Sequence, residues 1–133
     1  MSTTLLVLLT FCATASAYVH CPNVVEITRR DVKTSLFVAL VKVESSGATG
    51  DQYGDYYEFQ VKYEKLFQWW HYWVAEATII SDAPKTLKIN QKCDVQLERG
   101  QQYVLGCASF SNCHFVRPYK SLTQHELELI EKQ

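Results

Sequence analysis

Apolar and polar residues alternate along much of the chain, which is the pattern of half-buried β-strands. The clearest alternation spans residues 57–64. The side chains expected on its apolar face are Tyr57, Phe59, Val61 and Tyr63. A second β-rich run, 36–43, comes before it. Because residues 47–55 hold three glycines and two aspartates, we expect a flexible loop between the two strands.

Shorter β-rich runs follow, separated by Pro84, Gly100 and Gly106. These candidate strands are 74–80, 87–89, 103–105 and 114–116. Five or six short strands at this spacing are typical of a small antiparallel barrel or sandwich. The sequence therefore predicts a mainly β fold.

The hydrophobic period changes to that of a helix near the C-terminus. Thr123 and Glu126 have the spacing of a capping box, and Leu122 and Leu127 that of a hydrophobic staple. We expect a helix from Gln124 to Glu131. The side chains expected to dock on the sheet are Leu122, Leu127 and Ile130, and those expected in water are Glu126, Glu128 and Glu131.

The N-terminal segment has the features of a secretory signal. Residues 1–17 carry no charged side chain, and residues 4–13 are dominated by Leu, Val and Phe. Ala15-Ser16-Ala17 fits the small-x-small pattern that signal peptidase accepts. We expect a signal peptide at 1–17 and a secreted domain at 18–133. The apolar run is too short to span a bilayer, so no membrane anchor is expected.

Composition excludes several classes of function. The chain has 13 Lys and Arg against 14 Asp and Glu, so it offers no basic field to a nucleic acid. Hydrophobic residues make up 47% and charged residues 20%, which indicates a globular domain rather than a disordered one. A monomer is expected.

The sequence holds no recognisable catalytic motif. It contains neither H-E-x-x-H nor G-x-S-x-G, and no glycine-rich phosphate loop. Cys113 and His114 are neighbours, but adjacent residues on a strand point to opposite faces, so the imidazole could not reach the thiol. We expect neither an enzyme nor a cofactor.

Cleavage after residue 17 removes Cys12 and leaves an even number of cysteines. The remaining ones are Cys21, Cys93, Cys107 and Cys113. In an oxidising compartment four cysteines in a small domain predict two disulfides, with three possible connectivities. Zinc is a poorer explanation because the chain has no C-x-x-C pair.

Two cysteine-anchored motifs resemble the second half of the netrin-like module. They are Cys93-x-x-x-Leu97-x-x-Gly100-x-x-Tyr103-x-x-Gly106 and Cys113-x-Phe115-Val116-x-Pro118-Tyr119-x-x-Leu122. The module occurs in tissue inhibitors of metalloproteinases, netrins and complement C-terminal domains. Residues 57–67 resemble its strand after the first loop, and Tyr119 stands where the family most often has Trp.

The resemblance covers Cys21 to about Ile130 and extends to the small netrin-like excretory-secretory proteins of parasitic nematodes. It implies an OB-type, five-stranded antiparallel barrel with a C-terminal helix. It also implies disulfides Cys21–Cys93 and Cys107–Cys113. The other pairing considered joins Cys21 to Cys113 and Cys93 to Cys107.

The N-terminus departs from the inhibitors of this family. Those proteins open on Cys-x-Cys, and the α-amino group and carbonyl of the first Cys chelate the zinc of the protease. Here Tyr18-Val19-His20 precede Cys21, and Pro22-Asn23 replace the second half of the motif. The resemblance therefore implies the scaffold without this route of inhibition, and metalloproteinase inhibition is kept as the alternative function.

All three tryptophans lie within residues 67–73. Strand alternation can turn only part of this stretch toward a core, so the rest should be exposed, although the cluster could instead cover the barrel mouth. Trp and Tyr are enriched in binding hot spots. The candidate partner-binding residues here are Trp69, Trp70, Tyr72 and Trp73.

A second candidate surface combines the N-terminal segment with the loop 47–55 and the segment around Cys93. Its residues outside the loop are Cys21, Pro22, Asn23, Gln91, Lys92 and Cys93. We predict a secreted module that binds another extracellular protein, and the resemblance implies a host-interaction or immunomodulatory role.

The expected mature N-terminus also has the donor set of a copper or nickel site. A free amine, two backbone amides and an imidazole at the third position can surround Cu(II) or Ni(II) in a square plane. The residues concerned are Tyr18, Val19 and His20. The alternative is that His20 is simply solvated.

Overall fold

The computed structural model describes residues 20–70 and 73–131. The expected signal peptide, Tyr18, Val19 and Tyr72 lie outside these ranges. The strands are β1 (Phe37–Asp51), β2 (Gly54–Trp69), β3 (Thr86–Asn90), β4 (Gln102–Ser109) and β5 (Asn112–Pro118). The helices are α2 (Arg29–Lys33), α3 (Glu76–Asp82) and α4 (Gln124–Glu131), with short 3-10 turns η1 (Gln91–Cys93) and η2 (Tyr119–Ser121).

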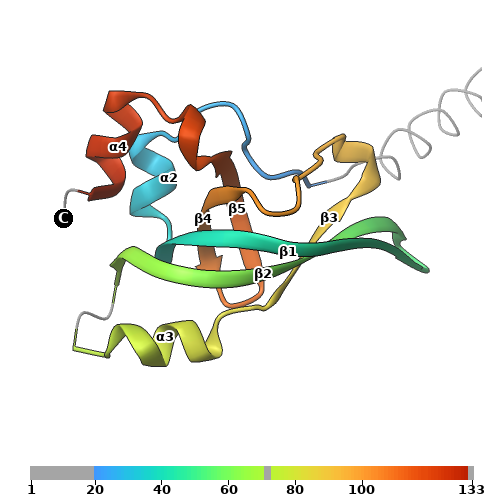
Figure 1. Ribbon diagram of the computed structural model, residues 1–133, viewed down its shortest axis with the longest axis horizontal. Coiled ribbons are helices and arrows are strands. Elements are labelled where there is room, and N and C mark those ends of the chain that lie inside the picture. Colours follow the sequence, from blue (N-terminus) through green and yellow to red (C-terminus); the bar gives the residue numbers. More distant parts are fainter. Residues whose placement is uncertain (1–19, 71–72, 132–133) are drawn as a thin grey trace, which may run out of the picture.

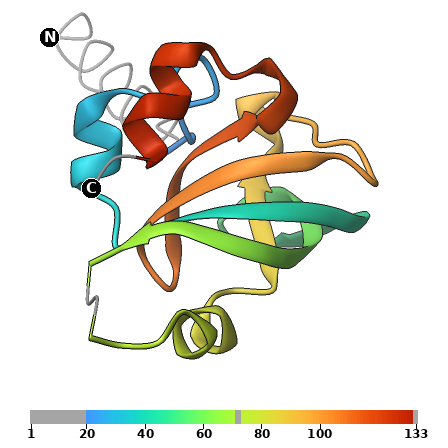
Figure 2. The same cartoon turned by 60° about the vertical axis from the view of Figure 1, so that its left-hand side comes forward.

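The five strands form one antiparallel sheet in the order β3-β2-β1-β4-β5 (Figure 1). This confirms the mainly β, OB-type fold with a C-terminal helix. Within the described residues the edge strands β3 and β5 do not pair, so the barrel is open. Figures 1 and 2 show α2 and α4 together on one side of the β1–β2 hairpin, with α3 on the opposite side.

The first part of β1, residues 37–41, is buried on both faces, which explains its continuous apolar run. One face contributes to the interior of the curved sheet, and these residues are Phe37, Ala39, Val41 and Val43. The other face packs under α2 and α4 through Val38 and Leu40, together with Phe115 of β5 and Ile130 of α4. The fold therefore has two hydrophobic clusters that share one strand.

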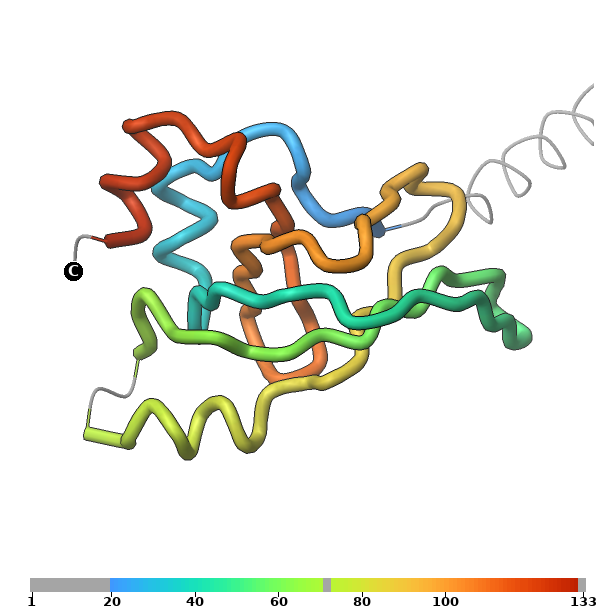
Figure 3. The backbone as a smooth tube through the Cα atoms, in the orientation of Figure 1, coloured from blue at the N-terminus to red at the C-terminus, as the bar shows by residue number. Residues whose placement is uncertain are grey.

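The prediction of a flexible loop at 47–55 is wrong. β1 and β2 continue through this region and form one long hairpin (Figure 3). The strands pair from Phe37 opposite Trp69 to Asp51 opposite Gly54. Asp51 Oδ1 accepts the backbone N–H groups of Tyr53 and Gly54 at 2.7 and 3.2 Å, and Gly54 has a φ of 148°. Asp51 and Gly54 therefore build a tight turn at the tip.

The prediction of a strand at 74–80 is also wrong, because most of this region forms α3. Ile79 and Ala83 lie four residues apart and both face the core, as one side of a helix requires. The helix is held at both ends. Glu76 Oε2 accepts the N–H of Leu66 at 3.1 Å, and the Tyr63 hydroxyl donates to the carbonyl of Pro84 at 2.9 Å. Tertiary contacts override the β-branched character of this stretch.

Helix α4 has the predicted bounds, and its capping box is present. The N–H of Glu126 donates to Thr123 Oγ1 at 3.2 Å, and Glu126 Oε1 accepts the N–H of Thr123 at 3.0 Å. Glu128 and Glu131 are exposed as expected, whereas the expectation that Glu126 lies in water is wrong: it is fully buried. The burial is stabilised by Arg117, whose guanidinium contacts the carboxylate at 2.9 Å.

Candidate functional site

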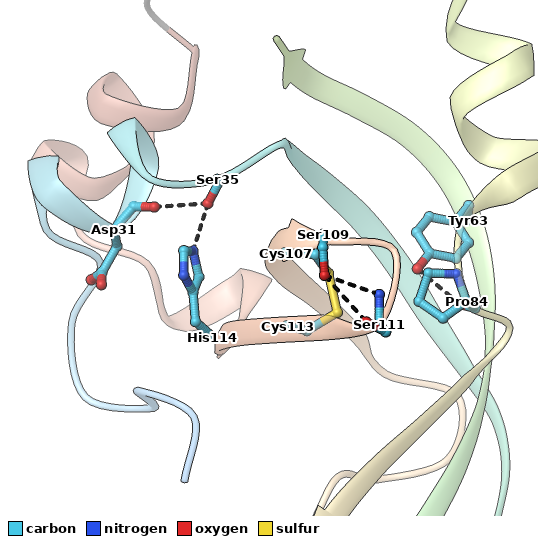
Figure 4. Close-up of a disulfide and its surroundings, with 9 residues drawn as sticks. All are labelled: Asp31, Ser35, Tyr63, Pro84, Cys107, Ser109, Ser111, Cys113 and His114. Atoms are coloured by element: carbon cyan, nitrogen blue, oxygen red, sulfur yellow. Dashed lines mark hydrogen bonds between the residues drawn. A yellow bond between two sulfur atoms is a disulfide. The ribbon is translucent and has the colours of Figure 1, made fainter. Parts of the chain in front are cut away.

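Both disulfides implied by the resemblance occur in the structure: Cys21–Cys93 and Cys107–Cys113. The first joins residues 72 positions apart and ties the N-terminal segment to η1. The second links residues that face each other across the β4–β5 hairpin (Figure 4). Every cysteine in the described ranges is therefore paired.

The N-terminal segment is joined to β5 by one parallel β-bridge between Asn23 and Phe115. The N–H of Asn23 donates to the carbonyl of His114 at 2.8 Å, and its carbonyl accepts the N–H of Val116 at 3.0 Å. The Asn23 amide is used within the chain as well, because its Nδ2 donates to Asp31 Oδ2 and to the carbonyl of Glu26 at 2.9 and 2.7 Å. This predicted partner-binding side chain thus has an internal structural role.

The structure brings the parts of the N-terminal surface together. A cavity of about 390 Å³ lies among the N-terminal segment, the β1–β2 turn and β3; it is lined by His20, Pro22, Tyr53, Tyr56, Lys88, Ile89 and Asn90. We call the combination of Cys21, Pro22, Asn23, Tyr53, Gln91 and Lys92 the N-terminal ridge. Cys21 and Lys92 are exposed, whereas Pro22 and Gln91 are half-buried. The rest of the segment 47–55 forms the paired strands of the hairpin instead of a loop.

The tryptophan cluster divides into a packed and an exposed part. Trp69 ends β2, packs against the interior cluster, and donates from Nε1 to the carbonyl of Val74 at 2.9 Å. Trp70 is 61% exposed and Trp73 is 71% exposed. The backbone N–H of Trp70 donates to the carbonyl of Leu36 at 2.9 Å, which holds this residue at the end of the sheet.

Trp70 lines two hollows. The larger, of about 440 Å³, lies between α2 and α4 and is lined by Arg29, Val32, Lys33, Gln68, Trp70, His125, Glu128 and Leu129. The smaller, of about 240 Å³, is lined by Thr34, Ser35, Leu36, Trp70 and Ala108. We call Trp70 and the α2–α4 groove the Trp70 surface; Trp73, which lies three residues before α3, is not among the residues that line either hollow.

Sequence reasoning did not identify the α2 side of this groove. The signal was present, because Thr28 and Asp31 form a capping box that starts a helix. Arg29 and Lys33 are then four residues apart on that helix, which places them on one face. Within the described residues neither cation has an ion-pair partner.

A serine–histidine contact lies between α2 and β5. The Ser35 hydroxyl donates to the carbonyl of Asp31 at 2.7 Å, and Ser35 Oγ lies 2.7 Å from His114 Nε2 (Figure 4). Since the single hydroxyl proton is used by Asp31, His114 donates to Ser35 and cannot accept a proton from it. Burial lowers the pKa of His114, which favours the neutral ring. The geometry gives this contact a structural role.

Residues 20–70 and 73–131 contain no group of three or more His, Cys, Asp or Glu side chains placed to hold a metal ion. Of the proposed copper or nickel site only His20 is described, so that site stays a prediction. Across the described part of the chain, no helix has the length and apolar character needed to cross a membrane.

Comparisons with known proteins connect this geometry to a family. A family model described as AceES-2, excretory-secretory protein 2, matches residues 19–131. The crystal structure of Ancylostoma ceylanicum excretory-secretory protein 2 is similar, with a TM-score of 0.53 and 25% sequence identity over 85% of this chain and 95% of that chain. A search of the curated proteins finds no match. The family match spans both disulfides, all five strands and the Trp70 surface.

Proposed function

Because the chain belongs to the excretory-secretory protein 2 family, we propose that it is a secreted module that binds another extracellular protein in a host-interaction or immunomodulatory role. The family itself implies secretion, and the match confirms the resemblance to small nematode excretory-secretory proteins. The single observation that carries the proposal is the exposure of Trp70 and Trp73 at 61% and 71%.

Exposed indoles such as those of Trp70 and Trp73 are favourable for association. Tryptophan offers a large apolar surface with little side-chain entropy to lose, and its truncation at an interface often costs about 2 kcal/mol or more. The backbone of Trp70 is fixed by its hydrogen bond to Leu36, so the main chain at this position needs little further ordering on binding.

The surroundings of Trp70 have the composition of a binding surface. Apolar side chains of Val32 and Leu129 line the groove, and the charged side chains of Arg29, Lys33 and Glu128 also border it. An apolar centre with a polar rim is the usual anatomy of a protein interface, because the rim excludes water and sets specificity.

Inhibition of a zinc metalloproteinase is the alternative function. It needs a free α-amino group on Cys21, whereas the α-nitrogen of Cys21 is in a peptide bond with His20. We therefore expect no inhibition from a chain that begins at Tyr18. N-terminal sequencing of the secreted protein and titration against a panel of zinc proteases test this directly. Stoichiometric inhibition at nanomolar concentration, with Cys21 as the first residue, would favour the alternative.

The experiment for binding starts with capture of extracellular host proteins on the immobilised chain, followed by affinity measurements with the purified partner. Trp70→Ala and Trp73→Ala should each raise Kd by about 30-fold, equivalent to about 2 kcal/mol. Their melting temperatures should stay within about 2 °C of the parent, since both side chains are exposed.

The matched control is Tyr53→Ala, because Tyr53 is 79% exposed and lies on the N-terminal ridge. It should leave Kd unchanged within about threefold. Loss of binding with Tyr53→Ala and retention with both tryptophan variants would move the binding site to the ridge. Unfolding of both tryptophan variants would place the indoles in the core.

A further inference from the structure

The two central strands of the sheet place two lysines directly opposite each other. Lys42 of β1 pairs with Lys62 of β2, and both residues are exposed. Like charges directly opposite each other destabilise a strand pair. Lysine often protects an open sheet edge from other strands, but Lys42 is not at an edge, because Gln102 of β4 pairs with it on its other side. The fold therefore carries this repulsion without gaining edge protection.

A turn fixed against β1 brings a third cation to this pair. The N–H of Gln101 donates to the carbonyl of Glu98 at 3.2 Å, which closes the turn. Gly100 within it has a φ of 84°, in the region that favours glycine. The N–H of Gly100 donates to the carbonyl of Val43 at 2.8 Å, and the N–H of Val43 donates to the carbonyl of Gln101 at 3.1 Å. The backbone of Arg99 is therefore held beside the lysine pair.

The three cations line one hollow of about 370 Å³ together with one acid, and we call it the basic hollow. Within the described part of the chain none of the three is in an ion pair. Three acids near the hollow do not line it: Glu64 accepts from Gln102 Nε2 at 2.9 Å, Glu58 pairs with Lys88 at 3.7 Å, and Glu98 lines another hollow. The lining side chains thus carry two more positive than negative charges. The lining residues are Lys42, Val43, Glu44, Lys62, Arg99 and Gly100.

This arrangement fits an anion that carries several oxygens. Arginine presents a planar fork of N–H donors that matches two oxygens of one oxyanion, whereas lysine supplies a compact positive charge with three donors. An anion in the basic hollow would attract both Lys42 and Lys62 and so offset the repulsion between them. The lysine pair is therefore more favourable with an anion bound than without one.

The lining of the basic hollow distinguishes between classes of anionic partner. Val43 is the only apolar side chain in the lining and is buried, so none of the lining residues is placed to insert into a bilayer beside an anionic headgroup. The lining also contains no aromatic side chain on which a nucleic-acid base would stack. Secretion, which the family implies, places the chain among the sulfated polysaccharides of the extracellular matrix.

We propose that the basic hollow binds sulfate groups of an extracellular polysaccharide. Lys42, Lys62 and Arg99 hold the sulfate oxygens by charge-assisted hydrogen bonds. The basic hollow shares no lining residue with either hollow beside Trp70. This binding is therefore an addition to the function proposed for the Trp70 surface and does not depend on it.

The test compares four probes on the intact secreted chain. They are a sulfated hexasaccharide, the same sugar without sulfate, a hexapeptide of glutamate, and vesicles that contain phosphatidylserine. Calorimetry gives each Kd, and NMR locates the contact. The sulfated sugar should shift the amide signals of residues 42, 62 and 99, and its Kd should be at least about tenfold lower than that of any other probe. Its log Kd should rise with log salt with a slope of about 2, because the cations release counterions from the sulfates.

Paired charge variants show whether these cations make the contact. Lys42→Gln combined with Lys62→Gln should raise the Kd of the sulfated sugar at least about tenfold and reduce the salt slope. The matched control is Arg30→Gln combined with Lys120→Gln, which removes the same charge from exposed residues outside the lining. Because distant surface charges are screened by salt, the control should leave Kd unchanged within about twofold.

A stability measurement separates a binding role of the lysine pair from a structural one. Lys62→Glu places opposite charges across β1 and β2, so it should raise the melting temperature by about 1–5 °C. The same variant should raise the Kd of the sulfated sugar at least about tenfold. A lower melting temperature would show that the lysine pair stabilises the fold, which would overturn the proposal.

Three binding results would also overturn the proposal. Equal affinity for the two hexasaccharides would show that sulfate is not recognised, and an unchanged Kd in the Lys42→Gln, Lys62→Gln variant would place the contact elsewhere. Tighter binding of the glutamate peptide would assign the basic hollow to an acidic protein segment, and tighter binding of the vesicles would assign it to an anionic membrane.

Discussion

Glu126 joins three separate parts of the chain through one carboxylate. Its oxygens accept hydrogen bonds from the N–H groups of Ile27 and Thr123 at 2.9 and 3.0 Å, and from Arg117 at 2.9 and 3.0 Å. Burial by itself would raise the pKa of this carboxyl. The hydrogen bonds from Arg117 and the two amides outweigh burial and lower the pKa from an ordinary 4.5 to about 2.

This shift makes stability depend on pH in the acid range. Because the folded pKa is lower than the unfolded one, the carboxylate stabilises the fold fully above about pH 4.5, and the contribution is lost as pH falls toward 2. Glu126→Gln should lower the free energy of unfolding by roughly 3 kcal/mol at pH 6 and by progressively less below pH 4.5. Urea unfolding at several pH values measures the difference. Glu128→Gln, on the exposed face of α4, should change stability little at any pH, and a pH-independent loss in Glu126→Gln would contradict this account.

Gly106 is required by its neighbour on β5. A Cβ built on Gly106 would lie 1.9 Å from the ring of Phe115, which is fully buried. Gly106→Ala should therefore destabilise the fold by about 1–3 kcal/mol or more, since a packed ring must move. The control is Gly47→Ala, where a Cβ would meet nothing within 4 Å and the stability should not fall. Chemical denaturation gives the free energy of unfolding of both variants. If the two variants were equally stable, Phe115 would not pack across Gly106.

Sequence reasoning at the residue scale worked where a role is local. The capping function of Thr123 and Glu126 follows from a three-residue spacing within one helix. The burial of Glu126 depends on Arg117 and Ile27, which only the tertiary fold brings beside it. A polar residue at such a position looks solvent-facing until its distant partners are known.

At the scale of elements, α3 shows how tertiary contacts decide between two secondary structures. The stretch 74–80 is rich in β-branched residues, which predicted a strand, yet Glu76, Ile79 and Ala83 are placed to contact β2 and the core only as a helix. The hairpin was missed for a different reason. Glycine and aspartate indicate a turn, but they do not say how far the strands extend on either side of it.

One substitution in α3 should change stability in opposite directions for a helix and for a strand. Thr78 is exposed, so its replacement changes propensity and little else. Thr78→Ala should stabilise the protein by a few tenths to about 0.7 kcal/mol, because alanine is the better helix former. If residue 78 were in a strand, the same substitution would destabilise the protein, because threonine is more favourable in strands than alanine is. Thermal unfolding of Thr78→Ala therefore tests the element directly.

At the scale of the whole molecule, the two disulfides constrain the unfolded chain to different extents. Cys21–Cys93 joins residues 72 positions apart, whereas Cys107–Cys113 joins residues 6 positions apart. In the chain-entropy model the double variant Cys21→Ala with Cys93→Ala should lose about 4 kcal/mol, and Cys107→Ala with Cys113→Ala about 2 kcal/mol. Denaturant unfolding gives both values. The reverse order would mean that packing around the buried Cys107 outweighs loop closure.

The whole fold was more predictable than its surfaces. Strand alternation and the terminal capping box are local signals, and they indicated the sheet and α4. The number of cysteines indicated two disulfides, and the family resemblance implied their pairing. The Trp70 surface combines α2, the end of β2 and α4, which are far apart in sequence. The sequence pointed to the tryptophans, but the groove beside them depends on how these elements pack.

The central claim is that Trp70 and Trp73 form the contact with an extracellular protein. The most direct measurement is oxidative footprinting of the indoles by mass spectrometry, with the chain free and in complex with its captured partner. We predict that complex formation reduces the oxidation of Trp70 and Trp73 at least about tenfold, while Tyr53 at the opposite end of the β1–β2 hairpin keeps its labelling rate. Unchanged oxidation of both indoles, with protection of Tyr53 or of the N-terminal ridge, would contradict the claim.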